Sequence, residues 1–316
     1  GRASWLEHRL LGVLLDRLGA PPLRCVLWDG STEVARGVEP ECDIQICDRG
    51  AMWRLISNPE YEFPALYVQG RVIPGDDLGQ LLEIVQRARR SLDPKSLGRR
   101  LRIALTRPRS GSLASARDNI HRHYDLGNDF YRLWLDEQMV YTCAYFPTPQ
   151  ATLEAAQTAK MDLICRKLRL RPGERVVEAG CGWGALALHM ARHYGVQVRA
   201  FNISESQLAW ARERAAAEGL EHAVEFVDGD YREIDGTYDV FVSVGMLEHV
   251  GPRHYPELAA VMDRGLAEDG RGLIHTIGTD RPGPLNAWIE RHVFPGAHPP
   301  SIGEMMPLFE PTGFSI

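Results

Sequence analysis

Residues 175–201 read RVVEAGCGWGALALHMARHYGVQVRAF, and this stretch decides the fold. The apolar run at 176–180 is typical of a buried strand, and three closely spaced glycines end it and follow it. Apolar residues at helical spacing over 185–195 then predict an amphipathic helix that ends on a glycine. A second apolar run at 196–201 predicts another strand. Strand, helix and strand in this order are typical of a parallel βαβ unit.

The same alternation of strand and helix continues toward the C-terminus. The predicted elements are a helix over 204–218, strands over 224–230 and 239–245, a helix over 254–267 and a strand over 272–278. Before this region, the pattern over 119–170 is helical and is broken at Pro147 and Pro149. Repeated βαβ units imply an α/β fold with a doubly wound, mostly parallel sheet. Ligands of such sheets bind at the carboxyl ends of the strands.

The N-terminal part has the pattern of a second, smaller α/β unit. Its predicted elements are a helix over 4–19, strands over 23–28 and 43–47, a helix over 49–57 capped by Asp48 and a helix over 77–91 capped by Asp76. Prolines, glycines and serines are frequent after this unit, as in a linker. We therefore divide the chain into a domain at 1–92, a basic linker at 93–118 and a main domain at 119–316.

The composition excludes several classes of protein. The chain has 316 residues, a formal net charge of −6 and 44% apolar residues, which excludes a disordered or fibrous protein and suffices for two domains. No uncharged apolar run approaches the roughly 18 residues of a membrane-spanning helix, and the first residues lack the pattern of a secretion signal. The six cysteines show no CxxC pair or zinc-ligand spacing, which predicts reduced thiols and no metal site. A soluble, cytoplasmic protein is therefore expected.

Positive charge is concentrated between Arg87 and Arg122, where eleven Lys and Arg residues accompany two acidic residues. A basic segment on an acidic protein predicts an anionic partner, either membrane lipid or nucleic acid. Nucleic-acid binding would favour aromatic residues among the basic ones, and none occurs between Arg87 and His121. The segment therefore favours an anionic phospholipid surface over nucleic acid. A solvated helix face followed by a linker is the simpler alternative.

The glycine turn after the first strand of the main domain is a candidate ligand-binding loop. Its sequence EAGCGWG (178–184) combines glycines that let the backbone approach a ligand with the N-terminus of a helix, which attracts anions. The GxGxG spacing favours S-adenosylmethionine, and an ordinary tight turn or a nicotinamide site are the alternatives. A dinucleotide fingerprint is GxGxxG with an acidic residue about 20 positions later. Here the second strand ends in the neutral residues Phe201, Asn202 and Ile203.

A second polar turn, DGDYR (228–232), follows the third strand of the main domain. Acidic residues followed by an aromatic ring are suited to bind an amino group and to stack on adenine. An ordinary polar turn has the same composition, so this motif alone is a weak indication.

Five motifs of the main domain occur in one order: HYDLGND (123–129), YTCAYF (141–146), EAGCGWG (178–184), SVGMLEHVG (243–251) and LIHTIG (273–278). In order and spacing this set resembles the cyclopropane fatty acid synthases and the mycolic-acid methyltransferases related to them. The resemblance extends from about His121 to Phe314. The N-terminal unit resembles, more loosely, the lipid-binding domain of the bacterial synthases, best at ALYVQG (65–70).

The resemblance implies a Rossmann-like class I methyltransferase fold with a helical, lipid-facing cover. Members of the family transfer the methyl group of S-adenosylmethionine to a cis double bond in a phospholipid acyl chain. The resulting carbocation loses a proton from the added methyl group, which closes a cyclopropane ring, and bound bicarbonate acts as the base. By resemblance, the catalytic residues are those that hold the bicarbonate: Cys143, Glu248, His275 and the backbone of Ile277.

The resemblance also implies a set of S-adenosylmethionine-binding residues. These are Tyr141, Thr142, Glu178, Gly180, Gly182, Trp183, Gly184, Asn202, Ile203, Gln207, Asp230, Tyr231 and Arg232. Two of them depart from the common pattern, since Glu178 stands where aspartate is usual and Asn202 stands where threonine is frequent. Both keep hydrogen-bonding capacity, so we expect cofactor binding to be retained.

The catalytic residues have simpler interpretations when each is taken alone. Cys143 would be a buried apolar side chain or a nucleophile, and Glu248 would be a solvated loop acid. His275 lies inside an apolar strand, where a buried imidazole needs a hydrogen-bond partner. The order of the five motifs favours the bicarbonate site over these alternatives.

Apolar residues at 285–306 are candidates for the walls of an acyl channel, because relatives place lipid-facing helices there. An ordinary packed helix and loop is the alternative. The same two interpretations apply to Phe130, Tyr131 and Trp134.

The leading interpretation is a peripheral membrane enzyme that cyclopropanates phospholipid acyl chains. The alternatives are a fatty-acyl C-methyltransferase that makes a methylene- or methyl-branched chain and a lipid-binding relative without catalysis. The family includes homodimers, and nothing in the sequence identifies a dimer face. The resemblance also implies two more strands and a tyrosine of the bicarbonate site, so we expect the C-terminal end of the domain to continue beyond Ile316.

Overall fold

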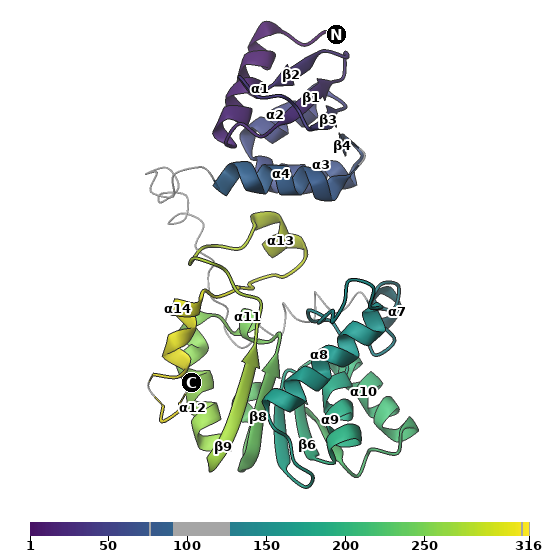
Figure 1. Cartoon of the computed structure of the whole chain (residues 1–316), viewed down its shortest axis with the longest axis vertical. Coiled ribbons are helices and arrows are strands. Elements are labelled where there is room, and N and C mark those ends of the chain that lie inside the picture. The colour runs from purple at the N-terminus through teal and green to yellow at the C-terminus, as the bar shows by residue number, and fades with distance from the viewer. Residues whose placement is uncertain (76, 91–126, 311, 316) are drawn as a thin grey trace. The chain divides into compact units, whose positions relative to one another are not determined.

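The structure, a computed structural model, describes residues 1–75, 77–90, 127–310 and 312–315. It contains two compact units, one of Gly1–Arg107 with Asn286–Val293 and one of Pro108–Leu285 with Phe294–Ile316 (Figure 1). The predicted linker, most of the basic segment and the predicted cap Asp76 lie outside the described residues. Residues 286–293, which the sequence pattern places in the main domain, group with the N-terminal unit. In the described part of the chain, no helix is both long and apolar enough to span a bilayer.

The N-terminal unit packs helices against a four-stranded sheet of order β2-β1-β3-β4. Its elements are α1 (Trp5–Arg17), β1 (Leu23–Leu27), β2 (Thr32–Val34), β3 (Cys42–Ile46), α2 (Arg49–Ser57), α3 (Pro59–Val68), β4 (Val72–Pro74), α4 (Leu78–Arg90) and, from the distant segment, α13 (Ala287–His292). The central strands β1 and β3 are parallel, and the outer pairs are antiparallel. The sequence pattern does not predict β2, α3 or β4, because the two strands are three residues long and α3 contains Pro64.

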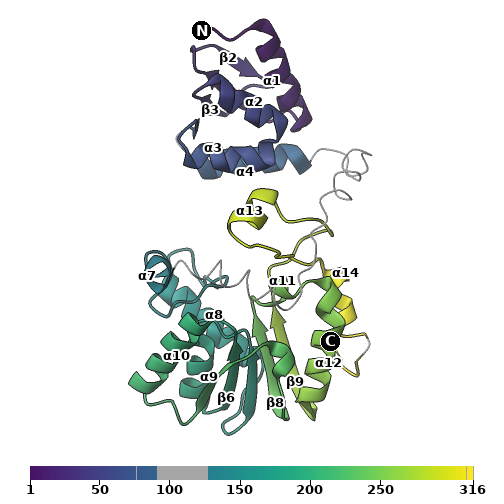
Figure 2. The same ribbon diagram turned by 180° about the vertical axis from the view of Figure 1, so that it is seen from behind.

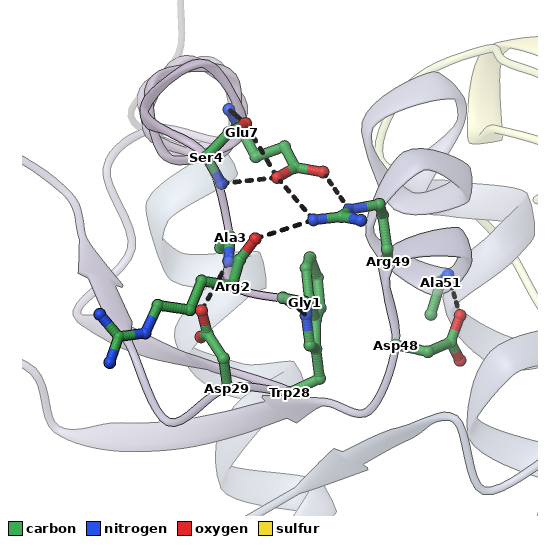
Figure 3. A network of polar contacts seen from close by, with 10 residues as sticks. All are labelled: Gly1, Arg2, Ala3, Ser4, Glu7, Trp28, Asp29, Asp48, Arg49 and Ala51. Atoms are coloured by element: carbon green, nitrogen blue, oxygen red, sulfur yellow. Dashed lines mark hydrogen bonds and ion pairs between the residues drawn. The ribbon is translucent and has the colours of Figure 1, made fainter.

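A network of polar contacts holds the start of α1 (Figure 3). Glu7 is buried, and its Oε2 accepts from the backbone N–H of Ser4 at 2.7 Å and from Oγ of Ser4 at 2.9 Å. Its Oε1 accepts from Nε of Arg49 at 2.6 Å. These hydrogen bonds, led by that from the Ser4 backbone, lower the pKa of Glu7. The predicted cap of α2 is confirmed, because the Asp48 carboxylate accepts from the N–H of Ala51 at 2.9 Å.

The C-terminal unit contains a five-stranded sheet of order β7-β6-β5-β8-β9, in which every neighbouring pair is parallel. Its elements are α7 (Asn128–Tyr131), α8 (Leu153–Lys167), β5 (Arg175–Ala179), α9 (Ala185–Tyr194), β6 (Gln197–Asn202), α10 (Glu205–Ala217), β7 (Val224–Asp228), η1 (Tyr231–Glu233), β8 (Tyr238–Val244), α11 (Leu247–Val250), η2 (Pro252–His254), α12 (Tyr255–Gly265), β9 (Leu266–His275), α14 (Ile302–Met305) and η3 (Met306–Leu308). The predicted doubly wound parallel sheet is confirmed. The last strand ends at His275, three residues before its predicted end, so Ile277 lies beyond the strand.

Alternate residues of the strands belong to two hydrophobic layers. Val176 and Val198 pack with residues of α8, α9 and α10. Val177 and Phe201, which point to the other face of the sheet, pack in a second cluster with residues of α12. Helices therefore cover both faces of this sheet (Figures 1 and 2). Because all five strands run in one direction, the segments that follow them emerge at one edge.

The helical prediction for 119–170 is wrong over 132–152, which forms turns and irregular backbone before α8 begins. Side chains replace the intrahelical partners in this segment. The Asp136 carboxylate accepts from the N–H of Val140 at 2.7 Å, and Nε2 of Gln157 donates to the Val140 carbonyl at 3.1 Å. Both side chains are buried, so these bonds hold the segment in a non-helical path.

Candidate cofactor and active site

The turn between β5 and α9 places backbone at the wall of a cavity. Gly180, Gly182 and Gly184 have φ angles of +83°, +54° and +80°, a region that favours glycine. A Cβ atom at Gly184 would lie 2.6 Å from Cζ of Phe226, whereas one at Gly182 would meet no atom within 4 Å. Gly184 therefore permits close packing of α9 and its neighbours, and Gly182 leaves open space for a ligand.

The cavity has a volume of about 220 Å³ and lies at the carboxyl ends of the strands. Every residue predicted to bind S-adenosylmethionine lines it except Gly184. The lining also includes Lys160, Met246 and Gly296, which the motifs did not indicate. The structure thus brings the predicted cofactor residues together from segments that are up to 91 positions apart, Tyr141 to Arg232.

Asn202 organises the cavity wall at the end of β6. Its side-chain nitrogen donates to the carbonyl of Gly182 at 3.1 Å and to Oε1 of Gln207 at 2.8 Å. Its side-chain oxygen accepts from the N–H of Ile203 at 2.9 Å. A threonine hydroxyl has a single donor and could not make both donations. The asparagine at this position therefore links the glycine turn to the start of α10.

An ion pair orders the polar turn at the end of β7. Nη1 of Arg232 lies 3.0 and 3.1 Å from the two carboxylate oxygens of Asp230, and Nε donates to Glu257 at 2.7 Å. The guanidinium carbon lies 4.5 Å from the ring centre of Tyr231. The carboxylate of Asp230 is therefore neutralised by Arg232, and the pair supports the loop from which Tyr231 reaches the cavity.

Two buried ionisable groups, one acidic and one basic, line the cavity near the end of β5. Glu178 is 2% exposed, and its Oε2 has no hydrogen-bond partner among the described residues. Lys160 is 5% exposed, and its Nζ donates to Oγ1 of Thr142 at 2.6 Å. Burial raises the pKa of Glu178 to about 8, against the effect of Lys160, and burial lowers the pKa of Lys160 to about 8. The sequence signal that could identify Lys160 as a site residue is its place among the buried positions of α8.

The four residues that the resemblance assigns to bicarbonate do not line this cavity. Oε1 of Glu248 accepts from the N–H of Ile277 at 2.6 Å, so the N–H of the backbone that the resemblance assigns to bicarbonate already has an acceptor here. Glu248 is 6% exposed, which excludes the interpretation as a solvated loop acid. Cys143 is exposed, which excludes a buried apolar role. The structure therefore joins Glu248 and Ile277 directly, in a way that spacing does not reveal.

Two buried polar atoms near the ends of β8 and β9 have no hydrogen-bond partner in the described part of the chain: Oε2 of Glu248 and Nδ1 of His275. The two strands are neighbours, and Val244 is in register with His275. Burial lowers the pKa of His275, and the charges of Lys160 and Lys167 add to this effect. The imidazole is thus favoured in its neutral form, with one nitrogen that donates and one that accepts.

Aromatic side chains surround Tyr131, which is fully buried. Its ring centre lies 5.5 Å from that of Tyr141 and 5.0 Å from that of Trp183, and both neighbours line the cavity. Tyr141 also stacks on Phe294, with ring centres 6.0 Å apart. Tyr131 therefore belongs to a packed cluster behind the cavity. The acyl channel expected at 285–306 stays a prediction.

Residues 112–316 match the family described as Mycolic acid cyclopropane synthetase. The chain belongs to this family. Over 190 residues it is 45% identical to the cyclopropane-fatty-acyl-phospholipid synthase of Escherichia coli (strain K12), an alignment that covers 60% of this chain and 48% of that protein. The chain thus spans about half the length of that relative. The predicted family resemblance is confirmed.

Two further comparisons extend this result. The chain is 34% identical over 293 residues to a probable fatty acid methyltransferase of Pseudomonas putida, and this alignment covers 89% of this chain and 72% of that protein. The crystal structure of mycolic acid cyclopropane synthase CmaA1, complexed with SAH and CTAB, superposes with a TM-score of 0.59 at 32% identity and covers 63% of this chain and 75% of that one. The predicted Rossmann-like class I methyltransferase fold is therefore confirmed.

Proposed function

We propose that the protein transfers the methyl group of S-adenosylmethionine to the cis double bond of a phospholipid acyl chain and forms a cyclopropane ring. The observation that carries this proposal is the cavity beside the glycine turn, whose wall is built by the predicted cofactor residues. Membership of the family supports it, as does the name of the E. coli relative. The crystal structure with SAH supports the choice of cofactor.

The residues of the cavity fit S-adenosylmethionine. The open space at Gly182 lets a ligand approach the backbone, and the buried Glu178 offers a carboxylate oxygen without a partner among the residues described. Tyr231 lines the cavity with a buried aromatic ring suited to an adenine. When bound, the cofactor supplies an electrophilic methyl group on a sulfonium centre. Water has to be kept from the reacting carbon, because it would otherwise capture a carbocation.

Ring closure requires a base that removes a proton from the added methyl group. Oε2 of Glu248, which has no partner in the described ranges, can accept a hydrogen bond from the hydroxyl group of a bicarbonate ion, and an Nδ1–H of His275 can donate to one of its charged oxygens. These two residues fit the anion in chemical type, and bicarbonate would supply the base. Cys143 is exposed and would contribute only a weak hydrogen bond, and the N–H of the Ile277 backbone could contribute only after it parts from Glu248.

The substrate proposed here lies in a membrane, so the protein needs a means of docking on it. We assign this role to the basic segment between Arg87 and Arg122 and expect peripheral association with anionic lipid from the cytoplasm. Reversal of Arg99, Arg100 and Arg102 to glutamate should weaken binding to anionic vesicles in a sedimentation assay at low salt. Wild-type binding should fall as salt rises. Unchanged vesicle binding of the triple variant would refute this role.

The test of the proposed function uses vesicles of cis-unsaturated phospholipid and S-adenosylmethionine with a CD3 methyl group, followed by mass spectrometry of the released fatty acids. A cyclopropane product has one added carbon, two deuterium atoms and no remaining double bond. The name of the Pseudomonas relative, a probable fatty acid methyltransferase, favours one alternative. A product that still reacts as an alkene would establish that branched-chain activity instead. Absence of labelled lipid, with cofactor binding shown separately, would contradict both and leave a lipid-binding relative.

A further inference from the structure

Lys160 is a buried cation on the wall of the cavity. It projects from α8, is 5% exposed and has one hydrogen bond, from Nζ to Oγ1 of Thr142 at 2.6 Å. An ammonium group has three donors, and buried lysines are almost always paired with an anion. Within the described ranges, the hydrogen bond to Thr142 is the polar contact that Lys160 makes, and no carboxylate forms an ion pair with it. The lysine is thus desolvated, and it forms no ion pair with any carboxylate of the described residues.

Glu178 is the complementary feature on the same wall. Its carboxylate is 2% exposed, and Oε2 finds no hydrogen-bond donor in the part of the chain that the structure describes. The charges of Glu178 and Lys160 act on one another, since each shifts the pKa of the other, but the two side chains form no salt bridge. Among the described residues, the cavity therefore presents one buried amine and one buried carboxyl group that form no ion pair, and burial disfavours the charged form of each.

A wall with separate positive and negative groups matches a zwitterion. We propose that Lys160 binds the carboxylate of the methionine end of S-adenosylmethionine, while Glu178 binds its ammonium group. This inference rests on the proposed function and adds a residue that neither the motifs nor the resemblance indicated. Thr142 lines the same cavity and orients Nζ through its hydroxyl group. Burial desolvates both groups, as the pKa of each indicates. A ligand with a carboxylate beside Lys160 and an ammonium group beside Glu178 compensates for this desolvation.

The test compares two ligands that differ only in the carboxylate. S-adenosylhomocysteine has both charged groups, and S-adenosyl-3-thiopropylamine keeps the ammonium but lacks the carboxylate. Isothermal titration calorimetry measures both on the wild-type protein, on Lys160→Met and on Lys167→Met, an exposed lysine of the same helix. We expect the wild type and Lys167→Met to bind S-adenosylhomocysteine about tenfold more tightly than the amine. Lys160→Met should bind the two ligands equally.

Equal affinity of the wild type for the two ligands would overturn the proposal. A Lys160→Met protein that loses affinity for both ligands by the same factor would also overturn it, because Lys160 would then act only by holding Thr142. Wild-type protein that binds neither ligand would contradict the proposed function itself. Circular dichroism checks the fold of each variant, and Lys160→Gln replaces Lys160→Met if the latter does not fold. The comparison of the two ligands on the wild-type protein tests the proposal whether or not a variant folds.

Discussion

The carboxyl ends of β5 and β8 are each followed or occupied by a buried glutamate with one oxygen that has no partner among the described residues, but the two glutamates have different surroundings. Glu178 is the fourth residue of β5, lines the cavity and is close to the charge of Lys160. Glu248 lies in α11, does not line the cavity and accepts from the N–H of Ile277. The same side chain is therefore suited to bind a cationic ligand group at one strand end and to hold a base at the next. Local partners, and not residue type, separate the two roles.

The largest effect is expected when Glu248 is replaced. Glu248→Gln keeps the shape of the side chain but weakens the acceptor that would hold the base, so we expect turnover to fall by about 100-fold or more. Affinity for S-adenosylhomocysteine should change by less than about twofold, because Glu248 lies outside the cavity wall. Product formation and calorimetry measure the two quantities, with the exposed Glu268→Gln as control. Normal turnover of Glu248→Gln would remove this residue from the mechanism.

A pH-dependent stability effect is expected at Glu178. Burial raises its pKa from 4.5 to about 8 in the folded protein. The unfolded chain therefore releases the proton at lower pH, and the folded state loses stability as pH rises from 4.5 to 8. Glu178→Gln removes this loss, so its free energy of unfolding relative to wild type should increase by about 3 kcal/mol between pH 5 and pH 8. Thermal unfolding of the ligand-free proteins measures it, and a constant difference across this range would contradict the burial argument.

A smaller effect is expected when cofactor affinity is measured on the Glu178→Gln protein. Glu178→Gln replaces a charged acceptor with a neutral one, and affinity for S-adenosylhomocysteine should fall about tenfold at pH 8. Turnover at saturating cofactor should stay within about threefold of wild type, because the proposed contact is to a part of the cofactor that does not react. Steady-state kinetics and calorimetry separate the two quantities. If Glu178→Gln behaves like Glu248→Gln, the distinction between the two strand ends is wrong.

The smallest effect is expected at Cys143, which is exposed and outside the cavity wall. Cys143→Ser keeps a hydrogen-bonding group, so turnover should fall by only about twofold to fivefold. Complete loss of activity would revive the interpretation of Cys143 as a nucleophile, which a mass-spectrometric search for a modified cysteine could then examine.

Much of the C-terminal unit could be predicted from local sequence. The strands and helices from β5 to α12 follow from runs of apolar residues and their spacing, because each buries a face against its immediate neighbours. The irregular segment at 132–152 could not be predicted in this way. Its conformation depends on Asp136 and Gln157, whose hydrogen bonds with the Val140 backbone replace those of a helix. In the N-terminal unit, the short strands β2 and β4 depend on pairing with β1 and β3.

The candidate site shows the same division. The sequence by itself determined the parallel sheet, the glycine turn and the family, and it indicated the cavity residues, because motifs that follow parallel strands must meet at one edge of the sheet. Only the tertiary structure decided that Lys160 reaches the cavity beside Glu178 and that Glu248 pairs with Ile277. The physical reason is that desolvation and hydrogen-bond partners depend on which distant segments pack together, and the spacing of residues along a chain does not specify either.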